Sequence, residues 1–336
     1  MSTTITVPSR DLRDCFSTLA LVAHKGSQLT PVSLILQNGK LTFICLQGCV
    51  VQSSLSVPCD EIANLVFMFH DVTPIMPPSG NVDVALFDYG VVVTGEDFSC
   101  QFPLGYSDVT EYDFSECRFT QIENNAYLDN LRIILAMNLD KLYGKPVPFT
   151  LFENVAVVKH SCCYIQTRTY GIPFQAQIDP EHIKMIIRLK PYEVSDTIPD
   201  TLVFRKGSNV LQIPCRSRVD ENDFMSYMEQ LKVVGTVSAN KLYERVNYSS
   251  KIGSKSRCRI HVTESGIKIT TNSDNASSSV SNGDMSKEVT FTAMFPIPVL
   301  LAFFRAIGDS QMEILAGGEL FCLRTQNLII LVRVEY

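Results

Sequence analysis

The chain has 336 residues, of which 46% are hydrophobic and 19% are charged, so it can bury the cores of two or three domains. It has no run of about 18 apolar residues and no basic-then-apolar N-terminus, so neither a membrane span nor a signal peptide is expected. The net charge of −6 argues against a protein held on nucleic acid by bulk positive charge, although basic residues gathered on one inner surface remain compatible with it.

The first third of the chain predicts short strands around one helix. Ser9 is expected to cap a helix over residues 10–24, because a serine hydroxyl can accept a bond from the first helical turn. Asn38-Gly39 predicts a tight hairpin. A second set of elements follows over residues 54–104, with a helix after Cys59 and then three strands. The strands expected before it are 4–7, 32–37, 40–46 and 50–57.

The middle third repeats this order after a linker, residues 105–117. A helix is expected from Asn125 to about residue 142, because Gly144 and Pro146 stop it. A second set of elements occupies residues 172–216, with a helix near Pro180. Another linker, residues 219–231, leads onward. The strands expected between the two helices are 149–152, 155–160 and 164–169.

The last third begins with a helix over residues 239–248, for which Ser238 is the expected cap. The Ser/Asn-rich residues 273–286 read as a short edge strand beside a loop. Pro296 and Pro298 precede a helix over 299–307, and Gly308 ends it. The expected strands of this region are 258–263, 267–272, 289–295, 311–316, 320–325 and 328–334.

These elements form a long repeat. Pro58, Pro180 and Pro298 occupy equivalent places and lie 122 and 118 residues apart. A companion unit precedes each of them, so the chain reads as six strand–helix–three-strand half-units. Repetition at a fixed period outweighs any single motif in predicting a fold. Paired in order, the half-units predict three domains, over residues 1–116, 117–232 and 233–336.

Candidate chemistry is sparse. Eleven cysteines without an evident framework indicate a reducing compartment. Cys45 and Cys49 are expected on one strand, roughly 13 Å apart, too far for a disulfide. Cys162 and Cys163 beside His160 would point to opposite faces of a strand, which favours structural thiols over a metal site. Five histidines form no ligand spacing, and no recognised catalytic motif occurs. The sequence therefore predicts no enzyme, no metal and no cofactor.

The order and spacing of the half-units resemble the bacterial-type DNA polymerase sliding clamp, a ring-forming processivity factor. The likeness spans residues 4–334 and is carried by ITVPSRDLRDCF, LTPVSLILQNGKLTF, FSCQFPLGYSDVTEYDF, VSANKLYERV, ESGIKITTNS, FPIPVLLAFFRAI and LIILVRV. It implies an α+β DNA clamp fold, three domains each of two βαβββ half-units, with helices lining the inner face and sheets outside. It also implies a cytoplasmic protein that encircles duplex DNA non-specifically and tethers DNA polymerase.

Two segments depart from the family pattern. Residues 160–164 read His-Ser-Cys-Cys-Tyr where clamps carry an Asp-Gly-His-Arg-Leu-like segment. The C-terminal strand reads Ile-Leu-Val-Arg where a Met-Pro pair is usual. These departures suit a phage or viral member and bear on the partner-peptide pocket more than on the ring.

Basic residues recur at one-face spacing on the expected helices, as at Lys184 and Arg188. By itself this pattern is typical of ordinary solvated helix faces. The resemblance implies instead that these faces line the hole, except for the helix after Cys59, which has Asp60 and Glu61 and no cation. The DNA-facing residues expected are Arg10, Arg13, Lys25, Arg132, Lys141, Lys145, Lys184, Arg188, Lys190, Lys241, Arg245, Lys251 and Arg305.

The resemblance also implies protein partners. Two copies would join head to tail, domain 1 against domain 3, through Phe98, Cys100, Phe102, Asn247 and Tyr248. Peptides of polymerase and clamp loader would enter a pocket between domains 2 and 3, although the same residues could simply seal that junction. The pocket residues expected are Tyr143, Tyr164, Phe224, Met225, Tyr227, Met228, Leu331, Val332, Arg333 and Val334.

Two other functions fit the same sequence. One is a monomeric viral-type processivity factor of related fold, which solution mass would separate from a ring. The other is a non-enzymatic, β-rich virion structural protein, which a DNA pull-down with polymerase would separate from both.

Overall fold

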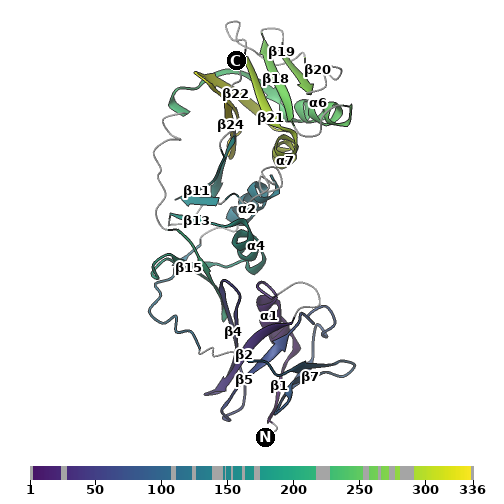
Figure 1. The fold of residues 1–336 in the computed structure, drawn as a ribbon, viewed down its shortest axis with the longest axis vertical. Coiled ribbons are helices and arrows are strands. Elements are labelled where there is room, and N and C mark those ends of the chain that lie inside the picture. Colours follow the sequence, from purple (N-terminus) through teal and green to yellow (C-terminus); the bar gives the residue numbers. More distant parts are fainter. Residues whose placement is uncertain are drawn as a thin grey trace. The chain divides into compact units, whose positions relative to one another are not determined.

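Contacts within the computed structural model divide the chain into two compact units. The first comprises Met1–Ile122 and Met185–Cys215, and the second comprises Glu123–Lys184 and Arg216–Tyr336. Figure 1 labels many of their helices and strands. The structure describes residues 3–23, 29–106, 111–122, 126–137, 147, 149–152, 154–160, 163–169, 175–216, 228–252, 257–263, 266–271, 277–280 and 291–333.

The first unit contains two antiparallel sheets. One has the strand order β1-β6-β7-β8 and the other the order β5-β2-β3-β4-β16-β15-β14-β9. Helix α1 (Ser9–Leu19) packs against β3 and β4. The strands are β1 (Thr3–Pro8), β2 (Thr30–Gln37), β3 (Lys40–Leu46), β4 (Val50–Ser56), β5 (Ala63–Phe69), β6 (Asn81–Phe87), β7 (Gly90–Thr94), β8 (Ser99–Pro103), β9 (Thr120–Gln121), β14 (Glu193–Ser195), β15 (Thr201–Lys206) and β16 (Asn209–Pro214).

An aromatic cluster forms the core between α1 and these sheets. Phe16 of α1 meets three rings edge to face, with centroid distances of 5.6 Å to Phe43, 5.3 Å to Phe69 and 5.8 Å to Phe102. Phe67 lies 5.4 Å from Phe102 and completes the group. All five rings are at most 1% exposed. Edge-to-face pairs add to the free energy of burial, so this cluster holds both sheets of the unit together.

The start of α1 differs from the prediction. Ser9 is the first helical residue, Pro8 occupies the N-cap, and no side chain caps the helix. The Ser9 hydroxyl donates instead to the carbonyl of Pro77, and the Ser9 amide donates to the carbonyl of Gly80. Serine at this place therefore ties α1 to the segment before β6. The helix also ends at Leu19, five residues earlier than expected.

The helix predicted after Cys59 is absent, and strand β5 follows an extended segment there. Phe67 and Phe69 are fully buried while Met68 between them is half-buried, which is the alternation of a strand. A short apolar run cannot be assigned to helix or strand by hydrophobicity alone. The prediction was wrong because it carried the helix over from the equivalent half-units.

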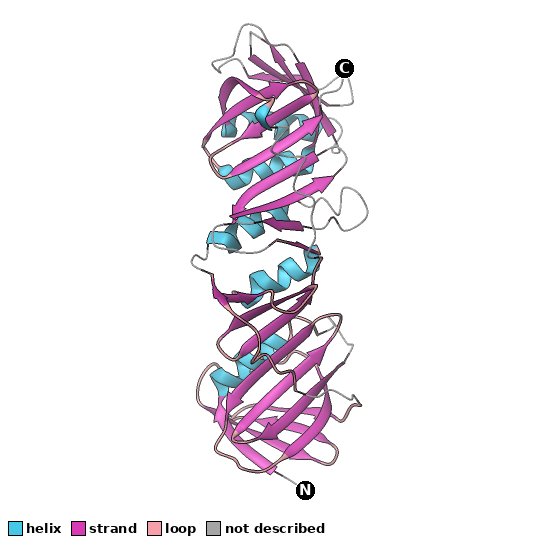
Figure 2. Ribbon diagram, turned by 90° about the vertical axis from the view of Figure 1, so that its left-hand side faces the viewer, coloured by secondary structure: helices cyan, strands magenta, loops and turns pink. Residues whose placement is uncertain are grey.

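The second unit also contains an eight-stranded and a four-stranded sheet, with orders β13-β10-β11-β12-β24-β23-β22-β17 and β20-β19-β18-β21. Figure 2 shows its helices against these sheets. The helices are α2 (Ala126–Ala136), α6 (Ala239–Ile252) and α7 (Ile297–Ile307), and α4 (Pro180–Leu189) spans the division between the units. The strands are β10 (Phe149–Phe152), β11 (Asn154–His160), β12 (Cys163–Thr169), β13 (Ala176–Ile178), β17 (Lys232–Ser238), β18 (Arg257–Thr263), β19 (Gly266–Thr271), β20 (Ser277–Val280), β21 (Phe291–Pro296), β22 (Gln311–Gly317), β23 (Leu320–Arg324) and β24 (Leu328–Arg333).

One connection scheme recurs three times. The strand that opens each half-unit pairs with its sister half-unit, so that β1 pairs with β6 while β5 pairs with β2. The same exchange joins β9 to β14 and β13 to β10. It then joins β17 to β22 and β21 to β18. The repeat and the α+β fold class predicted from the sequence are thus confirmed by strand pairing.

The tight hairpin predicted at Asn38-Gly39 is also confirmed. Asn38 and Gly39 have φ values of 52° and 68°, the left-handed backbone that a tight hairpin requires.

The prediction that Cys45 and Cys49 share a strand was wrong, because the turn between β3 and β4 separates them. Both thiols are buried, and burial raises the pKa of Cys49 to about 11. They belong to the core of the first unit.

Candidate functional site

Positive charge is concentrated on the helices. The five helices of the described chain hold nine basic and five acidic residues, whereas the whole chain holds 29 basic and 35 acidic residues. Each helix buries its apolar side against a sheet, which leaves its charged residues on the opposite face. The helix faces are therefore the place where a polyanion would meet this acidic chain most favourably.

Helix α4 shows the separation clearly. Ile183, Ile186 and Leu189 are at most 4% exposed, whereas Lys184 and Arg188 are exposed. Glu181 forms an ion pair of 2.6 Å with Lys184. Exposed pairs of this kind contribute little stability, so Lys184 can exchange this partner for another anion at small cost. Lys190, directly after the helix, adds one more exposed cation.

Helices α6 and α7 carry the strongest excess of positive charge. Lys241, Arg245 and Lys251 are exposed on α6, where Glu244 is the one acidic residue. Arg305 is exposed on α7, which has no acidic residue, and its guanidinium lies 5.9 Å from the centre of the Tyr243 ring. The two helices pack side by side within the second unit, so their cations share one surface.

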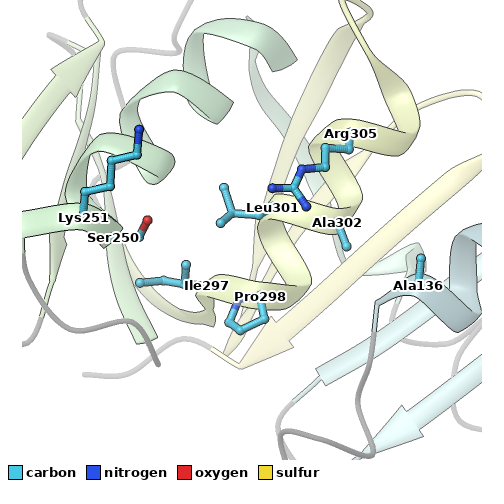
Figure 3. Close-up of a pocket in the computed structure, with 8 residues that line it drawn as sticks. All are labelled: Ala136, Ser250, Lys251, Ile297, Pro298, Leu301, Ala302 and Arg305. Atoms are coloured by element: carbon cyan, nitrogen blue, oxygen red, sulfur yellow. The ribbon is translucent and has the colours of Figure 1, made fainter.

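A groove of about 490 Å³ runs along this surface. Its floor is apolar, and Lys251 and Arg305 stand at its rim, with Leu301 of α7 between them in Figure 3. An apolar floor between two cations suits a sugar–phosphate backbone, because the sugar can lie on the floor while phosphates meet the rim. The lining residues are Ala136, Ser250, Lys251, Ile297, Pro298, Leu301, Ala302 and Arg305.

The other expected DNA-facing residues lie on α1 and α2 or outside the described residues. Arg10 and Arg13 on α1 are exposed and half-buried, but Asp11 and Asp14 make that helix neutral overall. Arg132 on α2 pairs with Asp129 at 2.5 Å. Lys25, Lys141 and Lys145 lie outside the described residues.

Two sheet edges carry the residues expected at an interface. Among the described residues, β8 pairs only with β7 and β20 pairs only with β19 as strands. Phe98 and Cys100 at β8 are half-buried, and the Cys100 sulfur lies 3.7 Å from Nε2 of His70. Phe102 is fully buried, so at that position β8 can offer a partner its backbone only. Tyr248 on α6 is 56% exposed, Asn247 is half-buried, and α6 packs against β20.

Part of the expected peptide pocket forms an apolar cluster in the second unit. Tyr164 of β12 pairs with Leu331 of β24, and Met228 packs on the same cluster. Burial raises the pKa of the Tyr164 hydroxyl, as expected for a phenol covered by apolar neighbours. Sequence reasoning missed five residues of this cluster that β-strand alternation and hairpin register could have indicated. They are Leu231, Leu315, Leu320, Cys322 and Ile329.

The other expected pocket residues are not in this cluster. Val332 is 2% exposed and follows Leu331 on β24, so its side chain points to the opposite face of the sheet. Adjacent strand residues cannot line one pocket together, which makes the grouping of Leu331 with Val332 wrong. Tyr143, Phe224, Met225, Tyr227 and Val334 lie outside the described residues, as does the side chain of Arg333.

The described residues contain no cluster of three or more histidine, cysteine or acidic side chains that could hold a metal ion. Within the same residues, no helix is long and apolar enough to cross a membrane. Cys162 lies outside the described residues, and β12 begins at Cys163.

The comparisons with known proteins agree with the strand-exchange topology. No family model and no curated protein matches the sequence. Solved structures match the fold along the whole chain. The Helicobacter pylori beta clamp in complex with 5-chloroisatin has a TM-score of 0.78 at 12% identity, covering 99% of this chain and 100% of that one. The chain has the sliding-clamp fold.

Two further clamps match equally well. The Caulobacter crescentus DNA polymerase sliding clamp has a TM-score of 0.76 at 14% identity, covering 99% of this chain and 100% of that one. The Pseudomonas aeruginosa sliding clamp has a TM-score of 0.77 at 11% identity and covers 99% of both chains. At identities of 11–14% the fold is shared while most residues differ.

Proposed function

We propose that the protein is a sliding clamp: two copies close into a ring around duplex DNA and tether a DNA polymerase to it. The ring holds the duplex by topology, so its helix cations need only weak, non-specific phosphate contacts, which permit sliding. This function requires no catalytic group, metal or cofactor. The protein would act in the cytoplasm, on replicating DNA.

The observation that carries this proposal is the pairing of last strands. The last strand of one half-unit meets the last strand of another twice within the chain, as β4 with β16 and as β12 with β24. Each joint is antiparallel and completes an eight-stranded sheet. The same rule leaves β20 and β8 as the third pair. Within one chain each ends a four-stranded sheet, and a second copy would complete both sheets and cover both edges.

This rule supports the three-domain division at residues 1–116, 117–232 and 233–336. Each division would contain one pair of strand-exchanged half-units. The boundary between the two compact units passes through the proposed second domain. Its strands β9 and β14–β16 belong to a sheet of the first unit, and its strands β10–β13 belong to a sheet of the second unit. Limited proteolysis within the linkers 105–117 and 219–231 tests these boundaries.

The deciding experiment compares circular with linear DNA. Protein assembled on a nicked circular plasmid should remain bound in high salt and be released once a restriction enzyme linearises the plasmid, because a ring can slide off an end. Light scattering should give about twice the chain mass of 37.5 kDa for the free protein. Equal loss from both DNA forms, with a monomeric mass, would contradict the ring and favour the monomeric processivity factor.

We also propose that the cluster around Tyr164 and Leu331 receives partner peptides. The Helicobacter pylori beta clamp has been solved with a DNA ligase peptide bound, at 12% identity and a TM-score of 0.75 to this chain. In this chain the cluster lies where β12 meets β24, and Met228 of the preceding linker packs on it. Adaptable methionine and aromatic side chains suit several partners that compete for one site.

Replacing Tyr164 with alanine should weaken binding of the cognate polymerase tail peptide at least about tenfold, because interface aromatics commonly contribute 1–2 kcal/mol or more. Fluorescence anisotropy of the labelled peptide measures this. The control is Tyr106→Ala, since Tyr106 is 98% exposed. Unchanged affinity in an intact Tyr164→Ala ring would place the pocket elsewhere. A substitution is preferable to deleting residues 332–336, because Val332 is buried in the sheet.

A further inference from the structure

The two half-units that carry the free edges have opposite charge. Residues 54–104, the half-unit that ends with β8, contain seven acidic residues and no lysine or arginine. Residues 232–271, which lead to β20, contain eight lysines and arginines and two acidic residues. So sharp a separation is unusual in a chain whose overall charge is only −6. It places an acidic edge at one end of the strand order and a basic edge at the other.

The acidic end is described in detail by the sheet β1-β6-β7-β8. Asp83 on β6 is the one charged residue within its four strands, and it accepts a hydrogen bond of 2.6 Å from Thr6. Glu96 and Asp97 are exposed in the turn that leads into β8, where the Gly95 amide donates to the Phe98 carbonyl at 2.7 Å. Asp88 is exposed in the preceding turn. These described strands and turns contain no lysine or arginine.

The basic end is the sheet β20-β19-β18-β21. Its described strands carry three exposed cations, Arg257, Arg259 and Lys268, and no acidic residue. Lys268 lies on β19 directly opposite Ser279 of the edge strand β20. His261 of β18 lies opposite Lys268 on the other side of β19, and it is hydrogen-bonded to Thr292 at 2.8 Å and Thr270 at 3.1 Å. Burial lowers the pKa of His261, and the positive charges of Lys268 and Arg259 lower it further, which shows the field of this patch.

These charges lie close enough to the two edges to act across a joint. Neighbouring strands are about 4.8 Å apart, so Lys268 is one strand from the β20 edge and Asp83 is two strands from the β8 edge. Across a β8–β20 joint, Lys268 would lie about 10 Å from β8 and about 19 Å from β6. At 0.1 M salt, where the screening length is about 10 Å, Lys268 therefore acts mainly on Glu96 and Asp97 beside β8, and Asp83 contributes at lower salt.

We propose that these opposite charges select a second copy of this chain as the partner of each edge, joining the acidic β8 end of one copy to the basic β20 end of the other. The inference rests on the proposed ring, and it adds the reason why the two copies join head to tail. Backbone hydrogen bonding alone would not select β20 as the partner of β8, because β8 could also pair with another β8 and β20 with another β20. Like charges oppose both of those pairings, while opposite charges speed the head-to-tail encounter.

The test uses two charge-reversed chains. One carries Asp88→Lys, Glu96→Lys and Asp97→Lys, which leaves Asp83 as the one acidic residue of the β8 sheet and its turns and makes both ends of the chain basic. The other carries Arg259→Glu and Lys268→Glu, so that both of its ends are acidic. Each chain alone should show a dimer Kd about a hundredfold higher than the wild type, because like charges then face each other at both joints. Mixed in equal amounts, the two chains should form heterodimers, since every joint again unites opposite charges.

Sedimentation equilibrium, with one chain fluorescently labelled, measures these species. The matched control reverses two exposed cations of the eight-stranded sheets, Lys159→Glu and Lys206→Glu, and should dimerise like the wild type. Raising salt from 50 to 500 mM should slow wild-type association about tenfold or more, as for electrostatically steered pairs. Circular dichroism confirms that each variant is folded.

Two results would overturn the proposal, and they are distinguishable. If the wild type is a dimer and both reversed chains dimerise equally well alone, the ring stands and its polarity has another cause. If the wild type stays monomeric at every salt and protein concentration, the proposed ring itself fails, and the charge selection fails with it.

Discussion

We expect duplex DNA to be released when four exposed helix cations are replaced by glutamate. The four are Lys184 and Arg188 of α4 and Lys241 and Arg245 of α6. Each phosphate contact that is lost should lower the slope of log K against log salt by about 0.9. Because two copies would line one ring, the change removes up to about eight contacts and should reduce affinity at 0.1 M salt by at least about a thousandfold.

The fold should survive this change, because all four side chains are exposed and such surface substitutions usually alter stability by less than about 0.5 kcal/mol. The matched control reverses four exposed cations outside the helices. These are Lys159, Lys206, Arg216 and Lys232. Anisotropy titrations with a labelled duplex across a salt series measure both variants. An unchanged salt slope in the folded helix variant, or an equal loss in the control, would contradict the assignment of the lining.

Replacing Phe16 with alanine should produce the largest loss of stability. Its ring is 1% exposed and packs edge to face on Phe43, Phe69 and Phe102, so its removal leaves a cavity where α1 meets both sheets. Substitutions of this type cost about 3–5 kcal/mol, a large part of the 5–15 kcal/mol that stabilises a typical domain. Guanidinium unfolding should show the transition of the first unit at clearly lower denaturant.

The control for this variant is Tyr106→Ala, which removes an aromatic ring of similar size from a 98% exposed position. Its midpoint should match that of the wild type, since little apolar surface leaves a buried environment. If the two variants unfold at the same denaturant concentration, the aromatic cluster does not hold the unit together in the way its geometry indicates.

Local pattern was enough to predict most of the fold. Strand β3 follows the predicted residues 40–46, and β10 follows 149–152, because each segment is short, apolar and bounded by a turn or a polar residue. The helix that fails, after Cys59, shows the limit of this reasoning. Its apolar residues fit either period, and the decision for a strand lies in the pairing of β5 with β2, some thirty residues earlier.

The candidate site was predicted less completely, for a related reason. The structure places Lys184 on an exposed helix face and Tyr164 in an apolar cluster, and their roles stay predictions. The residues that surround them come from strands that are distant in the sequence. Leu331, for example, pairs with Tyr164 although 167 positions separate them in the chain. Hydrophobic period assigns a residue to a face, but only the order of strands in the sheet brings that face to its partner.

The exchange of opening strands limits how such a chain can be divided. A single half-unit lacks the strand that its own sheet needs and carries one that belongs to its sister, so it cannot close a sheet by itself. A lone half-unit would need a second half-unit to complete its sheet, so a cut through a pair separates strands that depend on each other, whereas a cut between pairs leaves every opening strand with its partner. The pair of half-units is therefore the smallest part of the chain in which every opening strand has its partner.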